Sequence, residues 1–291
     1  MAFVLPVQYL PMKLIADAGS TKTDWRLVNN EGIVVGTFES GGLNPIVFDD
    51  ETLKKNIADS GELFNFSNNI SEVHLYAAGS DEPHAQQRLK HILTDIFDKA
   101  RINIYNDLLA AARATAGKNE GLVAIMGTGS NSGYYNGTEI VKTIGHFGYA
   151  LMDDASGNWF GRQLIRDYYF EIMPLRLRRQ FKKNYKVDED YIKTHVYLSD
   201  KPNAFLASYS IFMFEHYDEH YIKQLLLRGF TQFMESEMNA YREWKKYLPV
   251  HFVGSIAFFY QRELIQAVEK TGWKLGKIVR KPLDNLVEYH I

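Results

Sequence analysis

At 291 residues and 46% hydrophobic composition, the chain is long enough for two folded domains and far from the composition of a disordered protein. Its 33 basic and 35 acidic residues give a formal net charge of −2, which argues against nucleic acid as a partner and favours small-molecule chemistry. The sequence contains no cysteine, which excludes disulfides, a thiolate nucleophile, thiolate zinc sites and cysteine-held iron–sulfur clusters.

The N-terminal segment gives no sign of membrane insertion. Residues 1–11 are apolar but lack a basic leader, and the stretch before Lys13 is too short to span a bilayer. We therefore expect a cytoplasmic protein with no membrane partner. Because Met12 precedes the first convincing strand, Met1–Pro11 is either an extended start or a disordered tail, and the sequence leaves both open.

A polar turn joins two predicted strands at the start of the fold. The apolar segment Lys13–Ile15 leads into it, and Trp25–Val28 resumes as a strand. Glycine allows close backbone approach, successive N–H groups can bind an anion, hydroxyls donate to phosphate oxygens and lysine adds charge. The turn consists of Gly19, Ser20, Thr21, Lys22 and Thr23. It lacks the spacing of a P-loop, so it is either a phosphate site of another kind or a plain tight hairpin.

Asp17 ends the first strand, next to this turn. A carboxylate there would repel a nucleotide unless a cation lay between them, and Mg²⁺ held through water would resolve that conflict. The alternative is an aspartate that hydrogen-bonds to its own turn backbone.

A second hairpin of the same kind occurs later in the chain. Leu122–Met126 is a buried strand, and another runs through Tyr134-Tyr135 to a turn at Asn136-Gly137. The polar turn between these strands consists of Gly127, Thr128, Gly129 and Ser130. Because the same order of strands and turns recurs, we infer two duplicated halves and favour phosphate binding over two plain hairpins.

Helices alternate with strands through the rest of the sequence. Pro83–Lys99 has apolar residues at helical spacing and lies between strands at Val73–Tyr76 and Ile102–Tyr105. Trp159–Tyr247 is mostly helical, and Val250–Val253 is a late strand. This alternation predicts an α/β layer structure.

Gly254 and Ser255 follow the late strand and precede a predicted helix. A tight strand-to-helix turn of this kind would let a flat adenine approach the backbone. As an isolated pattern it is weak evidence for nucleotide binding.

Asp107 follows the strand Ile102–Tyr105 and precedes the helix-forming stretch Leu108–Ala114. By position it is a helix N-cap. A carboxylate at the end of a strand could also accept the proton of an attacking hydroxyl, as phosphoryl transfer to an alcohol requires. The two roles are compatible.

The stretch from Gly145 through Gly148 to Asp153–Trp159 gathers small residues and carboxylates ahead of a helix. It reads either as a loop that contacts sugar hydroxyls or as an acidic cap on a helix N-terminus.

Together these motifs resemble the actin/Hsp70/sugar-kinase superfamily, with phosphate motifs at Asp17–Thr23 and Ile125–Ser132 and an adenosine motif at Val253–Ala257. From Met12 onward the chain resembles the BadF/BadG/BcrA/BcrD ATPase family, in particular its N-acetylglucosamine kinase branch. The resemblance implies an α/β fold of two RNase H-like, actin-like ATPase lobes with a nucleotide cleft between them. The expected lobes are residues 12–115, with the segment after about 280 packing back on them, and 116–280 with a helical insertion.

The resemblance also implies a role for each matching residue. Asp107 would be the catalytic base, Asp17 would face Mg²⁺, and the two hairpin turns with Gly254 and Ser255 would bind ATP. The residues expected to contact the sugar are Asn44, Asp107, Gly148 and Asp153. The family usually reads Gly-Asp-Glu-Gly-Ser-Gly where this chain has Met152–Gly157, so it departs at three positions and the sugar stays open. The absence of cysteine excludes the dehydratase- and reductase-activating members of the family.

The sequence therefore predicts an ATP- and Mg²⁺-dependent kinase of an amino sugar such as N-acetylglucosamine or glucosamine. The alternative is a sensor or regulator that binds ATP and sugar with little turnover, and a third possibility is an ATPase that acts on a protein partner. A homodimer is left open.

Overall fold

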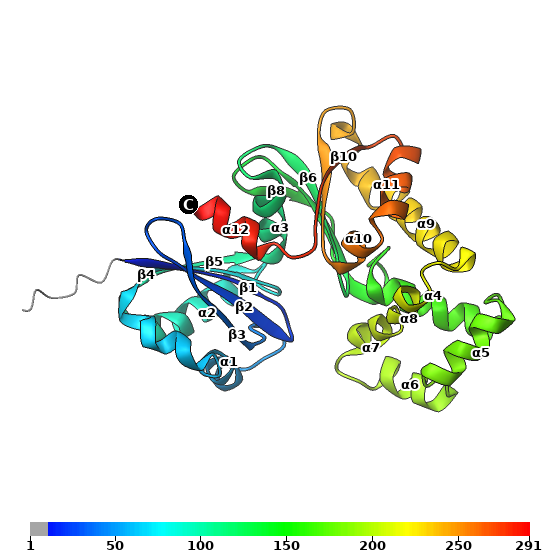
Figure 1. Cartoon of the computed structure of the whole chain (residues 1–291), viewed down its shortest axis with the longest axis horizontal. Coiled ribbons are helices and arrows are strands. Elements are labelled where there is room, and N and C mark those ends of the chain that lie inside the picture. The colour runs from blue at the N-terminus through cyan, green and yellow to red at the C-terminus, as the bar shows by residue number, and fades with distance from the viewer. Residues whose placement is uncertain (1–10) are drawn as a thin grey trace, which may run out of the picture. The chain divides into compact units, whose positions relative to one another are not determined.

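The computed structural model describes residues 11–291, so the question of Met1–Pro11 lies almost wholly outside the described residues. The chain divides into two compact units (Figure 1). The first holds the described residues up to Ala114 together with Pro282–Ile291, and the second holds Thr115–Lys281.

The first unit is built on a five-stranded sheet in the order β3-β2-β1-β4-β5. Strands β1, β2 and β3 are antiparallel, whereas β4 and β5 run parallel to β1. The strands are β1 (Met12–Ala18), β2 (Lys22–Val28), β3 (Val34–Gly41), β4 (Ile70–Ala77) and β5 (Arg101–Asn106). The helices are α1 (Asp50–Ala58), the 3₁₀ segment η1 (Gly61–Asn69), α2 (Pro83–Ile96), α3 (Asp107–Ala116) and α12 (Leu283–His290).

Both faces of this sheet are covered, which explains why β1 is apolar at consecutive positions. Leu14 packs with Leu53 of α1 and Leu89 of α2 on one face. Ile15 packs with Leu286 of α12 on the other. A central strand buried on both sides reads as a continuous apolar run rather than an alternating one. The covered sheet holds the ends of β1, β4 and β5 in fixed positions.

The second unit repeats this topology with the order β10-β9-β6-β7-β8, again with a central strand, an antiparallel hairpin on one side and parallel strands on the other. Its strands are β6 (Gly121–Met126), β7 (Ser130–Tyr135), β8 (Ile140–Thr143), β9 (Pro249–Val253) and β10 (Lys274–Val279). The predicted α/β class with two similar halves is confirmed. The predicted nucleotide cleft stays a prediction.

Helices and short 3₁₀ segments fill most of the second unit, as predicted for Trp159–Tyr247. They are η2 (Gly148–Ala150), α4 (Gly157–Tyr169), α5 (Leu175–Asn184), α6 (Glu189–Tyr197), α7 (Pro202–Ser208), α8 (Ile211–Glu215), α9 (His220–Glu235), η3 (Met238–Trp244), α10 (Ser255–Phe259) and α11 (Gln261–Lys270). Fully buried aromatic side chains such as Phe160, Phe212 and Phe230 join these helices to the sheet in one core. No helix within residues 11–291 combines the length and apolar character that crossing a membrane requires.

Candidate functional site

The first polar turn lies between β1 and β2 and is held mainly through its backbone. The amide of Gly19 donates to the carbonyl of Lys22 at 2.9 Å, and the carbonyl of Gly19 accepts from the amide of Leu43 at 3.1 Å. A Cβ atom at Gly42 would lie 2.5 Å from the carbonyl carbon of Ser20, so only glycine fits beside the turn. The segment after β3 therefore fixes the shape of the turn, while Ser20 and Thr21 are exposed.

Asn44 links this turn to the loop after β4. Its Nδ2 donates to Ser20 Oγ at 2.9 Å. A Cβ atom at Gly79, which has a φ of +76°, would lie 2.2 Å from Asn44 Oδ1. The hydroxyl of Ser80 donates to the carbonyl of Tyr105 at 2.9 Å and so ties this loop to β5. The structure thus gathers Asn44 and the first turn at one edge of the sheet, and it adds Gly79 and Ser80, which the sequence analysis did not single out.

The helix cap that the sequence placed at Asp107 belongs to Asn106, so that prediction was wrong by one residue. Asn106 Oδ1 accepts from the amide of Leu109 at 2.9 Å, and Asp107 is the first residue of α3. Asparagine and aspartate both cap helices well, and here the side chain of Asn106 occupies the N-cap position. Asp107 is half-buried at the N-terminus of α3.

Charged groups flank the first turn on its strand side. Lys22 Nζ donates to Glu39 Oε2 at 2.7 Å and to Asp24 Oδ1 at 3.0 Å, and these hydrogen bonds raise the pKa of Lys22 above its usual range. Exposed pairs of this kind contribute little to stability. Thr23 is buried, and its hydroxyl donates to the carbonyl of Gly41 at 2.9 Å. Asp17 lies directly opposite Asp24 in the β1–β2 register.

The second polar turn lies between β6 and β7 and is locked to the start of α4. The amide of Gly127 donates to the carbonyl of Gly129 at 2.9 Å. The carbonyls of Gly127 and Thr128 accept from the amides of Gly157 and Asn158 at 2.8 and 2.9 Å. A Cβ atom at Gly127 would meet no atom within 4 Å, so this backbone borders open space.

Asp153 connects the second turn to the loop ahead of α4. It is 3% exposed, Oδ1 accepts from the amide of Ser130 at 3.2 Å, and Oδ2 accepts from Asn158 Nδ2 at 2.6 Å. Asp153 and Ala155 both have positive φ, 65° and 57°, a region that disfavours residues with a Cβ. Gly148 precedes them with a φ of +68°, and its carbonyl accepts from the amide of Met152 at 2.8 Å.

Two more carboxylates, those of Asp154 and Glu237, lie in or near this loop. Asp154 accepts from Gln232 Nε2 at 3.1 Å and from Ser236 Oγ at 2.9 Å, which anchors the loop to the end of α9. The hydroxyl of Ser132 donates to Glu237 Oε1 at 2.7 Å. Burial, opposed by this hydrogen bond and reinforced by Asp154 and Asp153, raises the pKa of Glu237 to about 7. Glu237 could not be predicted from the sequence, because nothing local to it indicates that its partners lie on β7 and in the loop.

Gly254 lies beside the second turn. It has a φ of +122°, and a Cβ atom there would lie 2.2 Å from the carbonyl oxygen of Met126. Its amide donates to the carbonyl of Val279 at 3.0 Å, and Ser255 begins α10 as an exposed residue. The glycine lets the chain pass close to the end of β6, so Gly254 lies beside Gly127.

Several of the predicted site residues therefore form a group within each unit. In the first unit, Asn44 joins the turn Gly19–Thr21. In the second, Asp153 and Gly254 join the turn Gly127–Ser130. The assigned roles of all these residues stay predictions.

The residues present fit a nucleotide that brings its own Mg²⁺. No cluster of three or more His, Cys, Asp or Glu side chains in the described part of the chain is arranged to hold a metal by itself. Mg²⁺ that travels with phosphates needs only one or two protein carboxylates, often through water. Asp17, which precedes the exposed residues Ser20 and Thr21 of the first turn, is a carboxylate of that kind.

No protein-family model matches the sequence, and no curated protein does. The structure is similar to that of a Porphyromonas gingivalis protein named "Putative N-acetylglucosamine Kinase", at 34% identity and a TM-score of 0.89, covering 96% of this chain and 98% of that one. A Chromobacterium violaceum protein of the same name matches at 16% identity and a TM-score of 0.72, covering 97% and 99%. A ROK family glucokinase from Streptomyces griseus, solved with glucose and AMPPNP, matches at 12% identity and a TM-score of 0.56, covering 96% and 97%. The two matches at lower identity bear on the fold.

Proposed function

The chain belongs to the family of the Porphyromonas gingivalis "Putative N-acetylglucosamine Kinase", and we propose that it transfers a phosphoryl group from ATP to a hydroxyl of an amino sugar such as N-acetylglucosamine or glucosamine. Its place within the BadF/BadG/BcrA/BcrD family is part of this proposal. The observation that carries it is the duplicated turn: each unit ends its central strand in a glycine- and hydroxyl-rich loop held by its backbone.

The two turns are the proposed phosphate ligands. Ser20 and Thr21 are exposed at the tip of the first turn, and Gly127 borders open space in the second, so backbone amides and hydroxyls can reach phosphate oxygens. Lys22 would exchange its carboxylate partners, Asp24 and Glu39, for a phosphate. Gly254 and Ser255 would provide the close backbone approach that adenine needs.

Asp17 is the proposed partner of Mg²⁺, through water. ATP with its Mg²⁺ supplies the transferable phosphoryl group and neutralises charge that develops during transfer. The contribution of Asp17 is to orient this cation from the end of a rigid strand.

Asp107 is the proposed base. Its carboxylate lies on the first residue of α3, where the side chain of Asn106 caps the helix. It would accept the proton of the attacking sugar hydroxyl, a role in which positioning matters more than a raised pKa. Asn44, Gly148 and Asp153 are the proposed sugar contacts, with Asp153 also holding the second turn through Ser130.

A coupled assay of ADP release against a sugar panel tests this function. We expect sugar-dependent ADP release with at least one of N-acetylglucosamine, glucosamine, N-acetylmuramic acid and glucose, and a phosphorylated product by mass spectrometry. Asp107→Asn should lower kcat by at least about a hundredfold, the usual contribution of a general base. Asp81→Asn is the matched control, because Asp81 is an exposed carboxylate whose Oδ1 accepts from Asn106 in the same unit.

The outcomes separate the alternatives. Calorimetric binding of ATP and sugar without a phosphorylated product would replace the kinase by a sensor. ATP hydrolysis that ignores every sugar would point to an ATPase with a protein partner. An Asp107→Asn variant with full activity would remove only the base assignment.

A further inference from the structure

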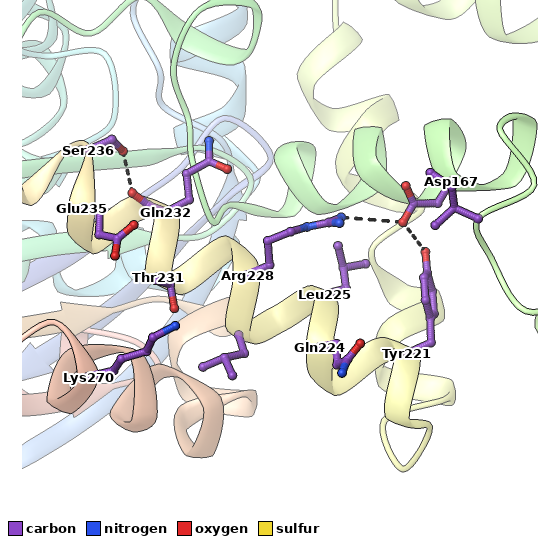
Figure 2. A pocket seen from close by; sticks show the side chains of 12 residues that line it. Asp167, Tyr221, Gln224, Leu225, Arg228, Thr231, Gln232, Glu235, Ser236 and Lys270 are labelled. Atoms are coloured by element: carbon purple, nitrogen blue, oxygen red, sulfur yellow. Dashed lines mark hydrogen bonds and ion pairs between the residues drawn. The ribbon is translucent and has the colours of Figure 1, made fainter.

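A groove of about 850 Å³ runs along one face of α9 in the second unit (Figure 2), and its lining includes none of the residues assigned above to phosphate binding. The end of α4 and the end of α11 form its sides. Its volume lies within the range of small-molecule sites in proteins. Most of its lining side chains carry a charge, an amide or a hydroxyl, which disfavours a purely apolar ligand.

At one end of the groove, neighbouring side chains compensate the charge of Asp167. Asp167 is 4% exposed, and its Oδ2 accepts from the hydroxyl of Tyr221 at 2.8 Å. Arg228 Nη2 lies 3.7 Å from the same oxygen, so a cation compensates the buried carboxylate. This end therefore has no charge left for a ligand to neutralise.

The other end presents two exposed side chains of opposite charge, Lys270 and Glu235. Within residues 11–291, neither Lys270 nor Glu235 has an ion-pair partner, although both line the groove. Thr231 Oγ1 is buried beside them with no hydrogen-bond partner in the described chain. A buried hydroxyl without a hydrogen-bond partner is costly, and a bound water or other molecule that supplies the partner removes that cost. An ammonium, a carboxylate and an unsatisfied hydroxyl thus meet at one end (Figure 2).

We propose that this groove binds a zwitterionic small molecule with a hydroxyl- or amide-rich body. Its anionic group would pair with Lys270 and its cationic group with Glu235. Thr231 and Gln224 would hydrogen-bond the body of the ligand. Two sources share this chemistry, an amino-sugar phosphate and a short peptide or amino acid. The proposal concerns binding and does not depend on the kinase assignment.

The groove is connected to the loop ahead of α4 through two shared residues. Gln232 and Ser236 line the groove, and both donate to the carboxylate of Asp154. Asp153, the next residue, holds the second turn. A ligand that orders the end of α9 would therefore also order Met152–Gly157.

Isothermal titration calorimetry on the full chain tests the proposal with four probes. Glucosamine 6-phosphate and the dipeptide alanylglutamine are zwitterions from the two sources. Glucosamine and N-acetylglucosamine 6-phosphate each lack one of the two charges. We expect at least one zwitterion to bind with a Kd below about 1 mM, and the single-charge probes to bind about tenfold more weakly.

Variants locate the binding. Lys270→Met and Glu235→Gln should each raise the Kd of the zwitterionic probe by about tenfold. Lys274→Met, the same change at an exposed lysine of β10 outside the groove, should leave that Kd unchanged. Hydrogen exchange at Met152–Gly157 should slow with ligand in the wild type and not in Lys270→Met. Failure of both zwitterions to bind, or binding that neither groove variant weakens, overturns the proposal. A homodimer that Lys270→Met dissociates would also overturn it, because the groove would then be a protein interface.

Discussion

Asp153 accepts a hydrogen bond from the amide of Ser130 at 3.2 Å, and its second oxygen accepts from Asn158 at 2.6 Å. The side chain therefore joins the second turn, the loop ahead of α4 and the first turn of α4 itself. Because it is almost fully buried, both oxygens depend on these donors.

Asp153→Asn should weaken this junction. The NH₂ group that replaces one carboxylate oxygen would face an N–H donor of Ser130 or Asn158. We therefore expect the free energy of unfolding to fall by about 1–3 kcal/mol and kcat/KM to fall with it. Urea denaturation measures the first effect. Asp154→Asn is the control, because its carboxylate is only half-buried and the hydroxyl of Ser236 can accept from the new amide while it donates to the carbonyl of Gln232, so the loss of stability should be smaller. Equal midpoints for Asp153→Asn and the wild type would contradict the structural role.

Two glycines near the second turn should behave in opposite ways when replaced by alanine. Gly254→Ala places a methyl group against the carbonyl of Met126 at a φ of +122°, so we expect a loss of more than about 2 kcal/mol of stability. Gly127→Ala meets no neighbour, so its stability should stay within about 0.5 kcal/mol of the wild type.

The same Gly127→Ala variant tests phosphate binding. The added methyl would occupy the space that a phosphate needs, and we expect KM for ATP to rise by about tenfold. Thermal unfolding without ligand separates this effect from misfolding. An unchanged KM in a stable variant would count against the second turn as a phosphate ligand.

Lys22 offers a further test of the first turn. Because its pairs with Asp24 and Glu39 are exposed, Lys22→Met should change the free energy of unfolding by less than about 1 kcal/mol. If Lys22 moves to a phosphate, KM for ATP should rise by about tenfold at low ionic strength, and less in high salt. Lys54→Met, on the surface of α1, should leave KM unchanged.

The duplicated fold could be predicted because its signals are local. Each hairpin carries its own turn residues, and the central strands are apolar enough to indicate burial on both faces. The edge strands β8 and β10 were not predicted. In β10, three of six residues are lysines or are exposed, so Lys274–Val279 lacks the apolar signal of a strand and depends on pairing with β9.

The candidate site was predictable only where one segment contributes all of it. The neighbours Asn106 and Asp107 have similar capping propensity, so sequence alone could not decide between them. Glu237 has partners on β7 and in the loop at Asp153-Asp154, and only the tertiary structure brings them together. The lobe boundaries near 115 and 280, the bound Mg²⁺ and a homodimer stay predictions.

The C-terminal helix should make the first unit sensitive to acid. Tyr76 accepts from Arg113 Nη1 at 2.9 Å, so its own hydroxyl can donate to His290 Nε2 at 2.8 Å, which requires a neutral imidazole. Burial, with the neighbouring His74, Arg113 and Lys13, lowers the pKa of His290 to about 3 from an ordinary 6.5. Below pH 6.5 the His290 imidazole is protonated in the unfolded chain but stays neutral in the folded one. The free energy of unfolding should therefore fall as the pH drops from 6.5 toward 3.

His290→Gln isolates that contribution. Glutamine can still accept from Tyr76 but does not titrate, so the fall in stability between about pH 6.5 and 4 should be smaller than in the wild type. His84→Gln, at an exposed position of α2, should keep the wild-type slope. Parallel slopes for His290→Gln and the wild type would show that α12 is not the acid-sensitive element.

Glu237 should produce the opposite dependence in the second unit. Its pKa of about 7 lies above the ordinary 4.5, so the folded state keeps a proton that the unfolded chain has already lost. This contribution to stability is complete below pH 4.5 and is lost as the pH rises through 7. Glu237→Gln keeps an acceptor for the hydroxyl of Ser132 and removes the buried charge. It should therefore exceed the wild type by about 1–3 kcal/mol near pH 8, with a difference that shrinks toward about pH 4.

Urea denaturation across this pH range measures the difference, and Glu243→Gln serves as the matched control, because its carboxylate is exposed and paired with Lys142. That control should show no gain at high pH. If Glu237→Gln is less stable than the wild type at about pH 8, the carboxylate must be ionised and compensated there. Glu237, near Asp153 and Asp154, would then carry a negative charge that a bound cation or a rearranged side chain balances.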